Sequence, residues 1–107
     1  MNYKFCGYKI LIESRLKKVI KKNLPKEYRE IFDEKIKYLS NNPSHPSLNT
    51  KPYNVSNKIL KNLGVDEVWE FYINRKGYRC IFYISHVDRI IIIAYVGNHC
   101  QVKNKFK

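Results

Sequence analysis

The sequence predicts an α+β fold in which a helical hairpin and an N-terminal strand pack on one face of a small, twisted antiparallel sheet. Three observations lead to this prediction: a short apolar run near the N-terminus, two helical segments after it, and three strand-like runs in the last third of the chain. Elements segregated in this way are typical of α+β proteins. With 107 residues, 44% of them hydrophobic, we expect residues 1–107 to form a single domain with one core.

The last third of the chain alternates apolar runs with tight breaks. Short breaks of this kind favour antiparallel hairpins, so we expect a three-stranded meander. We also expect His86, which falls in the second break, to be exposed to solvent. The three runs are Val68–Ile73, Tyr78–Ser85 and Arg89–Val96.

The N-terminal half of the chain supplies the first strand and both long helices. Tyr8–Ile12 is apolar enough for a strand, and Ser14 is expected to cap a helix over Arg15–Lys22. A second helix should span Lys26–Leu39, and both helices carry apolar residues at intervals of three and four. We expect this hairpin to cover one face of the sheet and to leave the other face open and concave.

The remaining segments are a polar loop, a short helix and a C-terminal tail. Asn42–Asn54 is rich in proline, asparagine and serine, and we expect it to be a loop anchored by Leu48. Ser56–Leu63 predicts a short helix, capped by its first residue and ended by Gly64. Gln101–Lys107 alternates polar and apolar residues, which leaves open a final edge strand or a frayed basic tail.

The charge of the chain favours a polyanionic partner. It has 21 Lys and Arg residues against 9 Asp and Glu residues, a net charge of +12. Nucleic acid, an acidic protein or an anionic membrane surface would fit, and so would a simply well-solvated surface. No apolar run is long enough to span a bilayer, and the start lacks the apolar core of a secretory signal.

The three cysteines predict a cytoplasmic protein with reduced thiols. Cys6, Cys80 and Cys100 have no metal-ligand spacing, so we expect no bound metal. An odd number of cysteines without a secretory signal also argues against a disulfide framework. Cys80 lies within a predicted strand, where we expect it to be buried.

Four short motifs follow one another along the chain: NPSHPSL at 42–48, WEFY at 69–72, YRCIF at 78–82 and GNH at 97–99. In this order and spacing they resemble the RelE/ParE superfamily of toxins from type II toxin–antitoxin pairs. The resemblance extends from about Tyr8 to Val102, and it implies a RelE-like fold and a cognate antitoxin as partner. Two positions differ from the family's pattern: Tyr72 stands where arginine is usual, and Cys100 stands where aspartate is frequent.

The resemblance implies a ribosome-dependent mRNA endonuclease, with the ribosome and mRNA as further partners. RNA cleavage of this type needs a base for the 2′-hydroxyl, a cation for the charge at phosphorus and an acid for the leaving 5′-oxygen. Side chains can supply all three, so we expect no cofactor. Two alternatives stay open: a ParE-like inhibitor of DNA gyrase without nuclease activity, and a catalytically inactive basic binding module.

Four residues are candidates for this chemistry. His99 matches the family's catalytic position, and histidine exchanges protons near neutral pH, so it can be the acid or the base. Arg79 either holds a phosphate or forms an ion pair with Glu70, which in turn is either the base or the group that orients Arg79. Tyr72 shares a strand face with Glu70 and can stack on a base or donate its hydroxyl to a phosphate. The opposite face carries core candidates: Trp69, Phe71 and Ile73.

Basic residues outside this group are candidates for RNA contact. Lys51 matches a region where some relatives place a catalytic or phosphate-binding lysine, and a solvated loop lysine is the alternative. Arg75 and Lys76 lie at a hairpin tip and can contact phosphate by charge alone. One face of the first helix is cationic and suits ribosomal RNA, through backbone charge, or an acidic antitoxin. Its basic residues are Arg15, Lys17, Lys18, Lys21 and Lys22.

Overall fold

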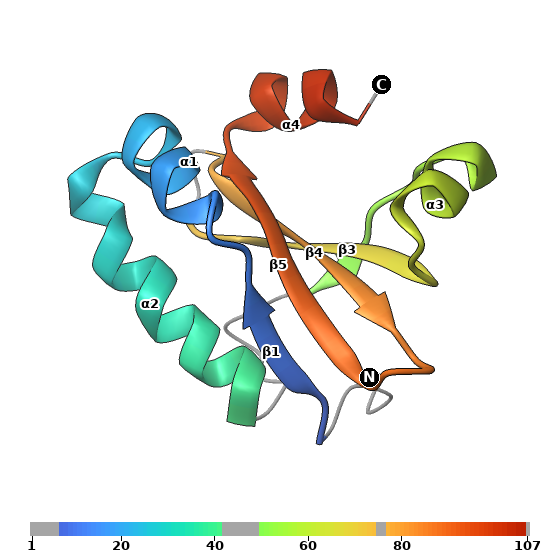
Figure 1. Ribbon diagram of the computed structural model, residues 1–107. Coiled ribbons are helices and arrows are strands. Elements are labelled where there is room, and N and C mark those ends of the chain that lie inside the picture. The colour runs from blue at the N-terminus through green and yellow to red at the C-terminus, as the bar shows by residue number, and fades with distance from the viewer. Residues whose placement is uncertain (1–6, 42–49, 75–76, 107) are drawn as a thin grey trace.

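The computed structural model describes residues 7–41, 50–74 and 77–106, and it has the predicted α+β architecture (Figure 1). The five strands form one sheet in the order β1-β5-β4-β3-β2. The predicted meander is confirmed, but the sheet is mixed and not purely antiparallel as predicted. The N-terminal strand β1 does not pack on a face of the sheet; it extends the sheet at its edge, because it pairs in parallel with β5. In chain order the elements are β1 (Lys9–Ile12), α1 (Leu16–Asn23), α2 (Lys26–Asn41), β2 (Lys51–Pro52), α3 (Asn57–Leu63), β3 (Glu67–Tyr72), β4 (Arg79–Ser85), β5 (Ile90–Gly97) and α4 (His99–Lys105).

The helical hairpin covers one face of the sheet, as predicted (Figure 1). Because side chains alternate along a strand, β3 sends one set of residues into this core and the other set to the opposite face. The predicted core members Trp69, Phe71 and Ile73 are buried there. From the helices come Leu16, Leu24, Phe32 and Leu39. Within the described residues, no helix is long and apolar enough to cross a membrane.

The opposite face is partly covered, so the prediction of an open face is wrong. Val102 and Phe106 are buried against Val68, Ile81 and Tyr83 of the sheet. They belong to the segment that we expected to be an edge strand or a tail, which instead forms α4 up to Lys105. The reason is their spacing: two apolar residues one helical turn apart bury a single face of a helix against the sheet.

The ends of α3 follow the sequence closely. Ser56 lies at the N-cap, where its Oγ accepts a hydrogen bond from the Ile59 N–H at 3.2 Å. Gly64 ends the helix with a φ of 70°, a left-handed conformation that glycine adopts without steric cost. Both predictions for this helix are therefore confirmed.

Ser14 does not cap α1, so that prediction is wrong. The helix begins at Leu16, and Arg15 occupies the N-cap position without a side-chain hydrogen bond. The N–H of Leu16 instead donates to the Glu13 carbonyl at 2.9 Å. A backbone turn therefore satisfies the donor that a capping side chain would otherwise bind.

A two-residue strand interrupts the segment that we expected to be a loop. In β2, Lys51 pairs with Glu70 and Pro52 pairs with Trp69. Proline has no N–H to donate, so it is tolerated here because β2 is the edge of the sheet. The expected anchor Leu48 lies outside the described residues, as does Cys6.

His86 is partly buried, contrary to the expectation of an exposed turn residue. Its ring is hydrogen-bonded to the Glu67 carboxylate on one side and to the Tyr8 hydroxyl, at 2.8 Å, on the other. Its backbone N–H donates to the Asp66 carboxylate at 2.7 Å. This network joins the start of β1 to the end of β4, far from Arg79 at the other end of the same strand. Sequence spacing could not reveal it, since these partners are distant along the chain.

Candidate active site

A cleft of about 460 Å³ opens on the sheet face that carries α4. Because α4 contacts β4 and β5 while β2 lies beyond β3, the cleft runs across the strands from α4 to the sheet edge. It brings together four residues that the sequence had singled out: Lys51, Glu70, Arg79 and His99. The other residues that line it are Pro52, Tyr53, Asn54 and Lys103.

Arg79 and Glu70 form an ion pair in the floor of the cleft. Arg79 Nη1 lies 2.9 Å from Glu70 Oε1, and the two side chains are only 11% and 6% exposed. In the β3–β4 register Arg79 faces Tyr72, so Glu70 is its diagonal neighbour on the same side of the sheet. Arg79 Nε also donates to the Gly77 carbonyl at 3.5 Å. The guanidinium is thus fixed in orientation, and of the two roles considered for Glu70 this contact favours orienting Arg79.

Tyr72 lies between two cations beside the cleft. Lys51 Nζ donates to the Tyr72 hydroxyl at 2.9 Å, and both Lys51 Nζ and Arg79 Cζ lie 4.7 Å from the ring centroid. The hydrogen bond to Tyr72 raises the pKa of Lys51 above its usual value. Lys51 is exposed, as the alternative of a solvated lysine expected, but it lies in β2 rather than in a loop and is hydrogen-bonded to Tyr72. Tyr72 therefore contacts one cation from each neighbouring strand, Lys51 of β2 and Arg79 of β4.

A capping box places His99 at the rim of the cleft. The Asn98 side chain accepts from the Gln101 N–H at 2.9 Å, and Gln101 Oε1 accepts from the Asn98 N–H at 2.8 Å. Gln101 Nε2 also donates to Asn23 Oδ1 at 3.1 Å, which ties α4 to the end of α1. His99 is the first residue of this anchored helix and is exposed. The imidazole thus stands at the mouth of the cleft, where a bound substrate could reach it.

The capping box at the start of α4 also requires glycine at position 97. A Cβ at this position would lie 2.8 Å from Gln101 Oε1, 3.0 Å from Gln101 Cβ and 3.2 Å from Tyr95 Cε2. Contacts this short would push Gln101 out of the capping box. The glycine of the GNH motif is therefore explained by close packing around the start of α4.

Sequence reasoning missed four residues of the cleft: Pro52, Tyr53, Asn54 and Lys103. Lys103 lies one helical turn after His99, so the two share a face of α4. That spacing would have revealed it if the C-terminal segment had been recognised as a helix. Tyr53 packs its ring 5.8 Å from that of Phe106, and burial raises the pKa of its hydroxyl. No signal in the sequence distinguishes Tyr53 from the other tyrosines.

The structure separates the remaining predicted RNA-contacting residues from the cleft. Arg15 at the N-cap of α1, together with Lys18 and Lys22 of the helix, is exposed, and none of the three lines the cleft. The helix packs on the other side of the sheet. Arg75 and Lys76 lie outside the described residues. The cationic face of α1 is therefore a second basic region, distinct from the cleft.

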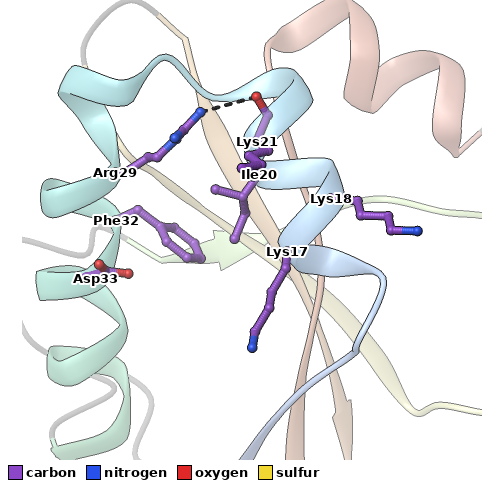
Figure 2. Close-up of a pocket in the computed structure, with 7 residues that line it drawn as sticks. All are labelled: Lys17, Lys18, Ile20, Lys21, Arg29, Phe32 and Asp33. Carbon is purple, nitrogen blue, oxygen red and sulfur yellow. Dashed lines mark hydrogen bonds between the residues drawn. The ribbon is translucent and has the colours of Figure 1, made fainter.

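That region borders a groove of about 450 Å³ between α1 and α2 (Figure 2). Figure 2 shows Ile20 and Phe32 between the two helices, while Lys18 points away from α2. Arg29 donates to the Lys21 carbonyl at 3.2 Å and so helps to satisfy the end of α1. The groove thus has an apolar floor and a mainly basic rim. Its lining consists of Lys17, Lys18, Ile20, Lys21, Arg29, Phe32 and Asp33.

The described cysteines and acidic residues provide no cluster for a metal. Within residues 7–41, 50–74 and 77–106, no group of three or more His, Cys, Asp or Glu residues could hold a metal ion. Cys80 and Cys100 are free thiols; Cys100 is exposed, and Cys80 is buried as predicted. Burial raises the pKa of the Cys80 thiol well above its usual value, so its reactive thiolate form is disfavoured.

Comparison with known proteins defines the fold. A chain in the crystal structure of the archaeal RelE–RelB complex from Pyrococcus horikoshii OT3 superposes with a TM-score of 0.61 at 18% sequence identity. The match covers 85% of this chain and 93% of that chain. No protein-family model and no curated protein sequence matches this chain significantly. The protein therefore has a RelE-like fold, as its sequence motifs predicted.

Proposed function

We propose that this protein is the toxin of a type II toxin–antitoxin pair and that it cuts mRNA on the ribosome. The observation that carries this proposal is the cleft, which gathers Lys51, Glu70, Arg79 and His99 on one face of a RelE-like fold. An imidazole, a fixed guanidinium and a further ammonium can supply the proton transfer and the charge stabilisation that phosphodiester cleavage needs. Action on ribosomes would place the protein in the cytoplasm.

In the proposed reaction the RNA cleaves itself with the help of these side chains. The 2′-oxygen attacks the adjacent phosphorus and forms a new P–O bond while the bond from phosphorus to the 5′-oxygen breaks. The 2′-hydroxyl proton passes to a base, and an acid gives a proton to the leaving 5′-oxygen. The products are a 2′,3′-cyclic phosphate and a free 5′-hydroxyl, and no electrons are gained or lost.

Each candidate residue takes a role that its contacts support. Arg79, held by Glu70, stabilises the negative charge that builds up on the phosphate. His99 transfers one of the two protons, since it is exposed at the mouth of the cleft. The Tyr72 oxygen already accepts a hydrogen bond from Lys51, so its own proton is available for the phosphate or the leaving oxygen.

The proposed protein and ribosome partners follow from the basic region around α1. The groove between α1 and α2 combines an apolar floor, made by Ile20 and Phe32, with a basic rim, and so suits an acidic segment of an antitoxin. A solved structure that shares this fold is a RelE–RelB complex, which supports an antitoxin as partner. The exposed lysines of α1 also suit the phosphate backbone of ribosomal RNA.

The test is cleavage of a defined mRNA on purified ribosomes, with cut sites mapped by primer extension. We expect cuts at the A-site codon that need the ribosome, and His99→Ala should slow cleavage by about 100-fold or more. Cys100→Ala is the matched control, because Cys100 is the next exposed residue of α4 and does not line the cleft.

Three results would contradict the proposal in different ways. Full cleavage by His99→Ala would remove the histidine from the mechanism. Intact translation together with arrested DNA synthesis would favour a gyrase inhibitor of the ParE kind. No effect on either process would leave a catalytically inactive basic binding module.

A further inference from the structure

Two lysines stand on opposite sides of the cleft. Lys51 belongs to β2 at the edge of the sheet, and Lys103 belongs to α4, which rests on β4 and β5. Between them the floor is formed by Glu70 of β3 and Arg79 of β4. A chain of phosphates lying across the strands would therefore meet a cation at each side.

The cationic side chains of the cleft differ in whether they already form hydrogen bonds within the protein. Arg79 is bonded to Glu70, and Lys51 is bonded to the Tyr72 hydroxyl. Lys51 Nζ and Arg79 Cζ each lie 4.7 Å from the centroid of the Tyr72 ring, so the two side chains form one positively charged subsite around that ring. Lys103 is exposed and forms no hydrogen bond or ion pair with another residue in the described part of the chain. Its ammonium thus has all its donors available to a ligand.

The helix α4 fixes the position of Lys103 relative to the cleft. His99 and Lys103 lie one turn apart and both line the cleft, so one face of the helix carries the imidazole and the ammonium. The capping box at Asn98 and the buried side chain of Phe106 hold the two ends of the helix. Lys103 is therefore presented to the cleft by an anchored element rather than by a loose tail.

We propose that Lys103 binds a phosphate of single-stranded RNA next to the phosphate held by Arg79 and Lys51. The cleft would then take a strand with at least two phosphates. This inference rests on the proposed function in so far as RNA is taken to be the ligand of the cleft. The inference goes beyond the proposed function by assigning a substrate-binding residue, Lys103, and a minimum length of the RNA substrate.

The test is binding of short 2′-O-methyl RNA, which lacks the attacking hydroxyl, to the isolated protein by NMR titration. The probes are a uridine dinucleotide with one phosphate and a uridine trinucleotide with two. We expect Lys103→Gln to weaken binding of the trinucleotide by about fivefold and to leave binding of the dinucleotide unchanged. Lys103→Arg should keep the affinity for both. With a longer strand, Lys103→Gln should make the negative slope of log affinity against log salt shallower by about 0.7.

Lys61→Gln is the matched control, because it removes the same charge from an exposed lysine of α3 that does not line the cleft. Equal weakening by the two variants would overturn the inference, since only the total charge would then matter. Unchanged trinucleotide binding by Lys103→Gln, or no binding of either probe by the unaltered protein, would also overturn it.

This experiment separates the inference from the proposed function, since no ribosome and no cleavage are involved. If the protein cuts mRNA on ribosomes but Lys103→Gln binds the trinucleotide normally, only the role of Lys103 fails. If the protein cuts no mRNA but shows the expected loss with Lys103→Gln, the RNA site stands and the proposed cleavage fails.

Discussion

Arg79 of β4 donates from Nη1 to Glu70 of β3 across 2.9 Å, and both side chains lie almost entirely beneath the surface of the cleft. An isolated charge at this depth would be costly, so each residue is tolerated because the other is present. The pair also limits what each can do. The guanidinium keeps a fixed direction, and the carboxylate that fixes it is not free to move toward a substrate.

Removing one member of this pair should therefore destabilise the protein. We expect Glu70→Ala to lower the free energy of unfolding by about 3 kcal/mol, because the Arg79 charge stays buried without its partner. The measurement is chemical denaturation. The double variant Glu70→Leu with Arg79→Met should recover most of this loss, since apolar side chains need no partner. A double variant less stable than Glu70→Ala would contradict this account of the pair.

The hydroxyl of Tyr72 can be tested apart from its ring. Tyr72→Phe keeps the ring beside Arg79 and Lys51 but removes the acceptor of the 2.9 Å hydrogen bond from Lys51. Since that bond raises the pKa of Lys51, the pKa should fall in the variant, as an NMR titration of the Lys51 side chain would record. Cleavage on ribosomes should slow by about tenfold or more if the hydroxyl transfers a proton. Unchanged cleavage with a lowered Lys51 pKa would restrict Tyr72 to a role in binding.

Two helix caps allow a stability effect to be separated from an effect on the site. Asn98→Ala removes the cap of α4, and Ser56→Ala removes the cap of α3. Each should lower the free energy of unfolding by about 1 kcal/mol. Only Asn98→Ala should also reduce cleavage, because α4 carries His99 into the cleft whereas no residue of α3 lines it. Equal losses of cleavage in the two variants would mean that general stability, and not the placement of α4, governs activity.

Stability at alkaline pH should depend on Tyr83. Its burial against α4 raises the pKa of its hydroxyl from 10.0 to about 12. The folded state then holds this proton more tightly than the unfolded state, so the stabilising contribution is complete below pH 10 and is lost as the pH rises toward 12. Tyr83→Phe should make the free energy of unfolding fall less steeply over this interval. An equally steep fall in the variant would assign the alkaline loss to other groups.

Local patterns in the sequence determined much of the fold and part of the site. Alternation along β3 correctly divided Trp69 and Phe71, which are in the core, from Glu70, which faces the cleft. The ends of α3 were readable because a serine cap and a left-handed glycine act within a few residues of the helix they bound. The same locality explains why the meander was predicted with nearly correct strand limits.

The sequence by itself thus determined the class of fold, the two faces of β3 and the residue types from which a site could be built. Only the tertiary structure decided that Gln101 would reach Asn23, that the C-terminal segment would form a helix, and that Lys103 would enter the cleft. The physical reason is the distance along the chain over which each kind of interaction acts. Caps, turns and side-chain alternation act between near neighbours, whereas a short helix such as α4 is marginal alone and gains its stability by burying Val102 and Phe106 on a sheet that distant segments build.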